Sequence, residues 1–218
     1  MTALLIKAAL GYLLGSIVGS LLVGTLRGGV DIRKEGSGNA GGTNALRTQG
    51  KAFAFWVLLI DLGKGWLATG LLALVRIPGV APGPAPLRAW AVAACGMTVM
   101  LGHVYPLWHG FRGGKGVATL VGAVLGALPL FLIPMLVVWL VAVILFGFVG
   151  LASILGAVTF AVAVAESGVQ PRVPLLTFAV LSAVLIAFTH RANIARMLAG
   201  TEPRARRLWL LGAARSRP

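Results

Sequence analysis

Long apolar runs that carry almost no charge limit what this chain of 218 residues can fold into. The first of these runs, residues 3–26, is long enough at 1.5 Å per residue to cross a hydrocarbon core of about 30 Å as a helix. In lipid a segment must pair its backbone N–H and C=O groups internally, which a helix does. Hydrophobic residues make up 58% of the chain and charged residues only 11%, against roughly 25% charged residues in ordinary soluble domains. We therefore predict an all-α, polytopic membrane helical bundle.

Seven apolar segments are expected to form transmembrane helices. The fourth is short, and the third has room to continue to residue 108. Residues 1–204 are predicted to form one membrane domain, and residues 205–218 a basic C-terminal tail. The seven segments are 3–26, 52–75, 88–101, 116–128, 131–147, 150–165 and 175–188.

The basic residues indicate the orientation of the chain. The formal net charge is +14, and 14 of the 19 Lys and Arg residues fall in the segments 27–51, 103–116 and 190–218. Basic residues collect on the cytoplasmic side of membrane proteins and also attract lipid headgroups. Seven spans with the N-terminus outside and the C-terminus cytoplasmic place all three segments on that side. Aromatic residues are not interleaved with the charges, so nucleic acid is not expected as a partner.

The first polar segment, Gly36 to Arg47, reads GSGNAGGTNALR and cannot pack as a core. Glycines allow successive backbone N–H groups to point at one anion, and Arg47 offers a planar fork suited to phosphate oxygens. A flexible connection between two helices is the alternative. The other candidate phosphate-binding residues here are Ser37, Gly38, Asn39, Thr43 and Asn44.

The second polar segment, Gly102 to Thr119, contains the sequence FRGGKG immediately before an apolar helix. Glycines at 113, 114 and 116 surround Lys115. Backbone donors, a lysine and a helix N-terminus together favour an anion. The spacing is not that of a Walker motif. The alternative is a pair of basic side chains that extend to the membrane interface.

The third polar segment follows the last apolar run, where His190 and Asn193 share a helical face. A further polar pair, Asp61 and Lys64 in the sequence DLGKG, interrupts the second span. Ionisable residues are costly within a membrane, and the i, i+3 spacing allows these two to neutralise each other. We interpret the pair as structural support for the neighbouring loop, with a direct catalytic role as the alternative.

Taken together, the three polar segments predict one basin for a phosphorylated substrate. Five acidic residues and one cysteine are spread along the chain, too few and too dispersed for a carboxylate-rich or cysteine-rich metal site. No metal or other cofactor is therefore expected. The nucleophile pattern GxSxG and the acyltransferase pattern HxxxxD are absent. A transporter of a phosphorylated solute is the alternative, although no internal repeat is visible.

The sequences SGNAGGTNALR, GHVYPLWHGFRGGKGVA and HRANIARMLAGTE, together with DLGKG, closely resemble the motifs of the bacterial acyl-phosphate:glycerol-3-phosphate acyltransferase family. The resemblance extends from about residue 3 to 204. It implies a multi-pass enzyme of the bacterial inner membrane whose active site faces the cytoplasm. Such an enzyme transfers a fatty acyl group from acyl phosphate to the 1-hydroxyl of glycerol 3-phosphate, and the products are lysophosphatidic acid and phosphate. No obligate protein partner is implied.

The resemblance also assigns roles to particular residues. It makes Ser37 and Arg47 phosphate-binding residues, places Lys115 in the same basin, and makes His190 and Asn193 substrate-binding residues. Gly113, Gly114 and Gly116 match positions of close backbone approach, and Glu202 matches a structural acid that could pair a nearby arginine. A substrate-assisted reaction without an acyl-enzyme is implied, in which Lys115, His190 and Asn193 form the catalytic set. The alternative is His190 as general base, since imidazole titrates near neutral pH.

Overall fold

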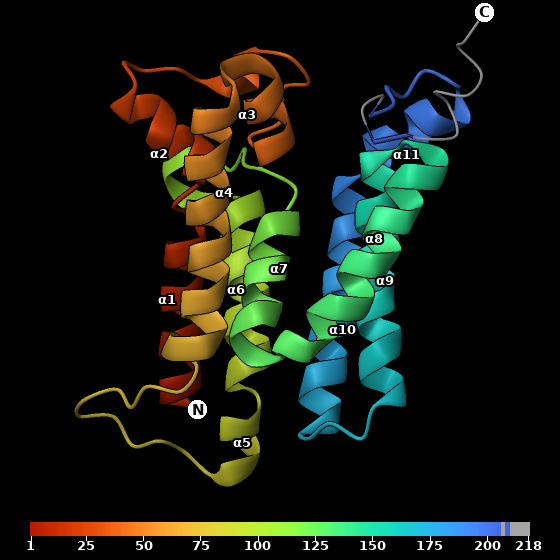
Figure 1. Ribbon diagram of the computed structural model, residues 1–218. Coiled ribbons are helices and arrows are strands. Elements are labelled where there is room, and N and C mark those ends of the chain that lie inside the picture. Colours follow the sequence, from red (N-terminus) through yellow and green to blue (C-terminus); the bar gives the residue numbers. More distant parts are fainter. Residues whose placement is uncertain (206–207, 210–218) are drawn as a thin grey trace, which may run out of the picture. The chain divides into compact units, whose positions relative to one another are not determined.

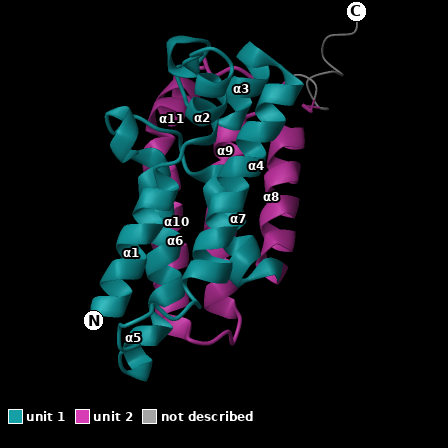
Figure 2. Ribbon diagram, turned by 90° about the vertical axis from the view of Figure 1, so that its left-hand side faces the viewer, with its two compact units in different colours: residues 1–129 teal, residues 130–218 magenta. Residues whose placement is uncertain are grey.

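The computed structural model describes residues 1–205 and 208–209, and this part of the chain contains helices and no strand (Figure 1). It divides into two compact units, Met1–Pro129 and Leu130–Pro218 (Figure 2). Most of the predicted basic tail, residues 206–207 and 210–218, lies outside the described residues.

The apolar segments predicted from the sequence are helices in the structure. Unit 1 contains α1 (Thr2–Gly15), α2 (Gly19–Leu26), η1 (Ile32–Lys34), α3 (Gly42–Gln49), α4 (Lys51–Trp66), η2 (Leu67–Leu72), α5 (Ala85–Ala89), α6 (Ala91–Val104), η3 (Leu107–His109) and α7 (Val117–Ala127). After η4 (Pro129–Phe131), unit 2 contains α8 (Leu132–Phe146), α9 (Val149–Glu166), α10 (Arg172–Thr189) and α11 (Arg191–Leu198).

Five helical segments of the described chain are long and apolar enough to cross a membrane. A sixth span is obtained if α1 and α2, which meet at a bend of 48°, count as one. Helix α7 has 11 residues and is therefore only about 16 Å long, too short to cross a hydrocarbon core alone. The chain is thus a multi-pass helical membrane protein, and the seventh span stays a prediction.

Glycines bring the helices of unit 1 close together. A Cβ atom on Gly15 of α1 would meet the backbone of Val99 in α6, and one on Gly102 of α6 would meet the backbone of Tyr12 in α1. Helices α4 and α7 approach each other in the same way, at Gly65 and Gly122. Small residues allow this approach in a membrane, where burying apolar surface in protein rather than in lipid contributes little.

The predicted first span contains a bend. Helix α1 ends at Gly15 and α2 begins at Gly19, although no proline lies between them. Lys64 of α4 donates hydrogen bonds to the carbonyl oxygens of Gly15 and Ile17, at 3.0 and 2.8 Å. Asp61 accepts one from the N–H of Gly19, at 3.0 Å. The lysine thus meets the carbonyl end of α1 and the aspartate the N–H end of α2, which are the charges that the two helix dipoles favour.

Unit 2 packs around aromatic rings and small residues. Phe160 of α9 makes edge-to-face contacts with Phe131 and with Phe178 of α10, at ring-centroid distances of 6.2 and 5.7 Å. Helix α10 ends at Thr189, and α11 continues the chain after a break at His190. This break changes the direction of the chain at the third polar segment.

Candidate anion-binding site

The first polar segment forms the last part of the loop between α2 and α3 and the first turns of α3. This loop is held in shape by Asn44 of α3. Its side-chain N–H₂ donates to the carbonyl oxygens of Ile32 and Glu35, at 2.9 and 3.0 Å, and its Oδ1 accepts from the N–H of Ser37 at 2.9 Å. Asn44 is 2% exposed. Its amide is therefore engaged inside the loop, and a contact of Asn44 with phosphate stays a prediction.

Other predicted residues of this segment lie on its outer side. Ser37, Thr43 and Arg47 are exposed, and Asn39 is half-buried. Thr43 and Arg47 are four residues apart in α3 and therefore share a face of that helix. Gly38 has a φ of +71°, which favours glycine and turns the chain at the tip of the loop. The loop thus presents hydroxyl, amide and guanidinium donors on a surface that Asn44 keeps in shape.

Within the second polar segment, residues 110–116 form a tight turn between η3 and α7. The N–H groups of Gly113 and Gly114 donate to the carbonyl oxygens of Val104 and His103, at 3.0 and 3.1 Å. A Cβ atom on Gly113 would meet the carbonyl oxygen of His103, and one on Gly114 would meet the His103 ring. Side chains at these two positions would therefore force the turn away from α6.

Lys115 follows this turn and lies directly before the N-terminus of α7. It is half-buried. Gly116, the N-cap of α7, has a φ of +87°, a left-handed conformation that glycine adopts without strain. One turn further, the hydroxyl of Thr119 is buried. Among the buried side-chain N and O atoms of the described residues, it alone has no hydrogen-bond partner. A lysine beside N–H groups at a helix N-terminus is suited to an anion.

Arg33 joins the two loops, a role that the sequence analysis missed. Its guanidinium donates to both carboxylate oxygens of Asp31 at 2.8–3.2 Å, and its Nη1 donates to the carbonyl oxygens of His109 and Arg112, at 2.9 Å each. These hydrogen bonds hold the pKa of Asp31 below its ordinary value and raise that of Arg33. Because Arg112 directly precedes the Gly113 turn, Arg33 fixes the first loop against the second. Figure 1 shows both loops at the same end of unit 1.

A buried cluster of Asp61, Lys64 and His103 lies beneath this end of unit 1. Lys64 Nζ is 2.9 Å from Asp61 Oδ1, and His103 Nδ1 is 2.8 Å from Lys64 Nζ and 3.3 Å from Asp61 Oδ1. All three side chains are at most 3% exposed. The ion pair predicted from the i, i+3 spacing is thus present. Through His103, which supports Gly114, the cluster connects the bend between α1 and α2 with the Lys115 turn.

The third polar segment is organised by Glu202 in unit 2. Asn193 Nδ2 donates to one carboxylate oxygen of Glu202, and Arg196 Nε donates to the other, each at 2.6 Å. The arginine partner expected for Glu202 is therefore Arg196. Asn193 is 8% exposed. Glu202 thus holds Asn193 and Arg196 of α11 in position.

His190 lies at the junction of α10 and α11 and is 4% exposed. Its Nδ1 lies 2.8 Å from the carbonyl oxygen of Ile186. A carbonyl oxygen only accepts hydrogen bonds, so Nδ1 carries a proton, and the neutral ring has its lone pair on Nε2. This tautomer can accept a proton or a hydrogen bond at Nε2.

The structure brings the first and second polar segments together within unit 1. The third polar segment lies in unit 2. No signal in the sequence marked Arg33, because its carbonyl partners lie 76 and 79 positions further along the chain. The described residues contain no group of three or more His, Cys, Asp or Glu side chains that could hold a metal ion.

These features define a multi-pass helical membrane protein that presents two donor-rich loops at one end of its N-terminal unit. The chain belongs to the glycerol-3-phosphate acyltransferase family, whose model matches residues 5–200. It is 42% identical over 199 residues to a glycerol-3-phosphate acyltransferase of a Synechococcus strain, a match that covers 91% of this chain and 93% of the relative. It is also 42% identical over 200 residues to the enzyme of Mesorhizobium japonicum, covering 91% and 94%.

Solved structures give the same assignment. The chain is similar to PlsY (YgiH), an integral membrane glycerol 3-phosphate acyltransferase, in its glycerol 3-phosphate form, with a TM-score of 0.78 and 34% sequence identity. That match covers 94% of this chain and 96% of the other. The lysophosphatidic acid form of the same protein matches with a TM-score of 0.76.

Proposed function

We propose that this protein transfers a fatty acyl group from acyl phosphate to the 1-hydroxyl of glycerol 3-phosphate. The products are lysophosphatidic acid and inorganic phosphate, and the reaction is the first acylation of phospholipid synthesis. The observation that carries the proposal is the pair of glycine-rich, cation-bearing loops that Arg33 joins at one end of unit 1. The relatives' names, and a similar structure with glycerol 3-phosphate, agree with this substrate.

Binding is assigned to the residues predicted from the sequence, with Asn44 now placed in support. Arg47 and Lys115 hold phosphate oxygens, with donors from Ser37, Gly38, Asn39 and Thr43, and with the close approach allowed by Gly113, Gly114 and Gly116. His190 and Asn193 hold the acceptor, and Glu202 fixes the position of Asn193. Two loops that bear cations and backbone donors favour a phosphate over a neutral ligand.

The chemistry requires alignment and charge stabilisation more than a strong nucleophile. Acyl phosphate is a mixed anhydride, so the hydroxyl oxygen of glycerol 3-phosphate attacks the acyl carbon and the C–O bond to phosphate breaks. Lys115 stabilises the departing phosphate, and a phosphate oxygen of the donor accepts the hydroxyl proton. The alternative is a second route, in which His190 accepts that proton as general base.

The orientation belongs to the same proposal. We infer seven membrane helices, counting the bent α1–α2 pair and the short α7 as one each. With the basic segments on the cytoplasmic side, the N-terminus is then outside and the C-terminus is in the cytoplasm. The active site then faces the cytoplasm of a bacterial inner membrane. Residues 1–204 act as a single catalytic domain, without a cofactor or an obligate protein partner.

The test uses purified protein with acyl phosphate and glycerol 3-phosphate, and it measures phosphate release together with lysophosphatidic acid. We expect Lys115→Ala to lower kcat/KM by at least about 100-fold, because it removes a cation beside the departing phosphate. Lys51→Ala is the matched control, since Lys51 is an exposed lysine at the start of α4. Lys115→Ala activity within a few-fold of wild type would remove the second loop from the site. Uptake of glycerol 3-phosphate into vesicles without turnover would favour a transporter.

A further inference from the structure

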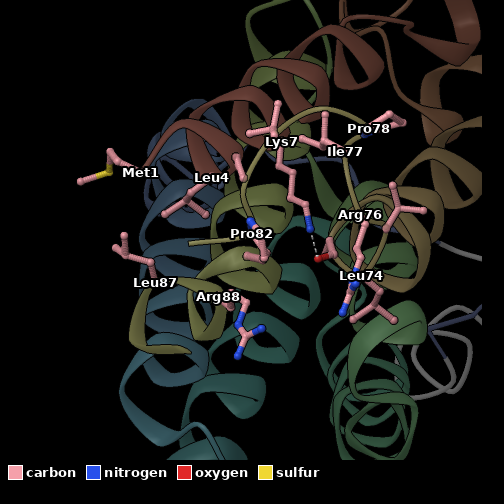
Figure 3. A pocket seen from close by; sticks show the side chains of 15 residues that line it. Met1, Leu4, Lys7, Leu74, Arg76, Ile77, Pro78, Pro82, Leu87 and Arg88 are labelled. Carbon is pink, nitrogen blue, oxygen red and sulfur yellow. Dashed lines mark hydrogen bonds between the residues drawn. The ribbon is translucent and has the colours of Figure 1, made fainter. Parts of the chain in front are cut away.

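A cavity of about 530 Å³ lies in unit 1 away from the two loops (Figure 3). Its walls come from the start of α1, the residues after η2, helix α5 and the start of α6. Helix α6 begins at this cavity with Ala91 and ends at Val104, which binds the Gly113 turn. Its 14 residues correspond to about 20 Å, so the cavity and the two loops lie at opposite ends of unit 1.

Three basic side chains from three different segments line the cavity: Lys7, Arg76 and Arg88. Figure 3 shows them around it, with the Lys7 ammonium bonded to the carbonyl oxygen of Ala73 at 2.6 Å. Arg76 and Arg88 are exposed. No Asp or Glu is among the lining residues. The positive charge of this cavity is therefore not balanced by a carboxylate in its walls.

This grouping is unusual for the chain as a whole. Only five Lys or Arg residues lie outside the ranges 27–51, 103–116 and 190–218, and three of those five line this one cavity. Topology accounts for basic residues at the end of unit 1 that carries the loops. It does not account for three of them at the other end.

The rest of the cavity wall is largely apolar. Leu4, Leu74 and Leu87 are among the lining residues. The cavity lies where α1 begins and where the span of α4 and η2 has ended, which is the level at which a bilayer meets water. A ligand that fits must therefore join a negative group to an apolar body.

We propose that this cavity binds the phosphate of an anionic phospholipid, with the guanidinium groups of Arg76 and Arg88 on the phosphate oxygens and the first acyl carbons against Leu4 and Leu87. The volume suits a headgroup with its glycerol, and the remaining acyl chains continue into the bilayer. A free phosphate would leave the apolar wall uncovered. This lipid site is separate from the proposed substrate site and does not depend on the proposed activity.

Native mass spectrometry of the full chain in detergent tests the proposal by titration with phosphatidylglycerol or with zwitterionic phosphatidylcholine. We expect one phosphatidylglycerol to bind the wild type in preference to phosphatidylcholine. The double variant Arg76→Gln/Arg88→Gln should bind it roughly 25-fold more weakly, about fivefold for each charge removed near an anionic lipid. Arg76→Lys/Arg88→Lys keeps both charges and should retain affinity within about threefold. If the Gln double variant is not monodisperse, the two single variants replace it, each about fivefold weaker.

The matched control is Arg27→Gln/Lys51→Gln, which removes two exposed charges from the other end of unit 1. Its affinity for phosphatidylglycerol should equal that of the wild type. Equal losses in both double variants would mean that net charge alone attracts the lipid, and would overturn the proposal. Displacement of the lipid by millimolar inorganic phosphate would assign the cavity to a free anion and would also overturn it.

Discussion

Replacing Lys64 by methionine tests whether the buried Asp61–Lys64–His103 cluster holds unit 1 together. The methionine keeps the length and apolar stem of the lysine but removes an ammonium that lies 2.9 Å from Asp61 and bonds two carbonyl oxygens at the end of α1. Removing one partner of a buried ion pair typically costs 3–5 kcal/mol, because the remaining charge is left without compensation. We therefore expect Lys64→Met to lower the free energy of unfolding by about 3–5 kcal/mol.

Unfolding can be followed by tryptophan fluorescence as sodium dodecyl sulfate is added to detergent micelles of the purified protein. Lys51→Met is the matched control, because the same substitution is made at an exposed position of the same helix. It should change the free energy of unfolding by at most about 0.5 kcal/mol. A loss for Lys64→Met within about 1 kcal/mol of this control would refute the reasoning.

A double-mutant cycle separates mutual compensation from simple packing. Asp61→Asn alone should also be strongly destabilising, because it leaves the Lys64 ammonium buried without its carboxylate. The combination of Asp61→Asn with Lys64→Met leaves no buried ion pair to break. It should therefore be more stable than the sum of the two single losses predicts, by about 2–3 kcal/mol. Additive losses would contradict a coupled pair.

Three further predictions use the same preparation. Asp31→Asn should destabilise the protein by about 1 kcal/mol at pH 7. Because folding lowers the pKa of Asp31 from 3.8, the difference in stability between wild type and variant should persist down to about pH 4 and vanish at lower pH. A difference that does not change with pH would contradict the Asp31–Arg33 pair. Gly102→Ala should cost about 1–3 kcal/mol by separating α6 from α1, whereas the control Gly63→Ala, at a site with open space, should not destabilise the protein. His190→Ala should raise KM for glycerol 3-phosphate at least about tenfold, and both limbs of the pH profile of kcat should remain. Loss of one limb would contradict this prediction and identify His190 as the general base.

The bend in the first span shows where local patterns stop being informative. The sequence around residues 15–19 contains no proline and continues the apolar run, so it predicts one span over residues 3–26 and does not indicate the bend. The bend is stabilised by Lys64, which lies 49 positions from Gly15. Asn44 likewise lies among residues predicted to bind phosphate, and only the folded loop shows that its amide is engaged internally.

The sequence alone determined the features that follow from spacing along one helix. Apolar length located the helices, the i, i+3 spacing gave the Asp61–Lys64 pair, and the motifs gave the family. The tertiary structure alone decided which loops meet, through Arg33, and which cations gather around a cavity at the other end of unit 1. The physical reason is that helix geometry sets distances between residues a few positions apart, whereas contacts across 40 or 80 positions depend on which helices pack together.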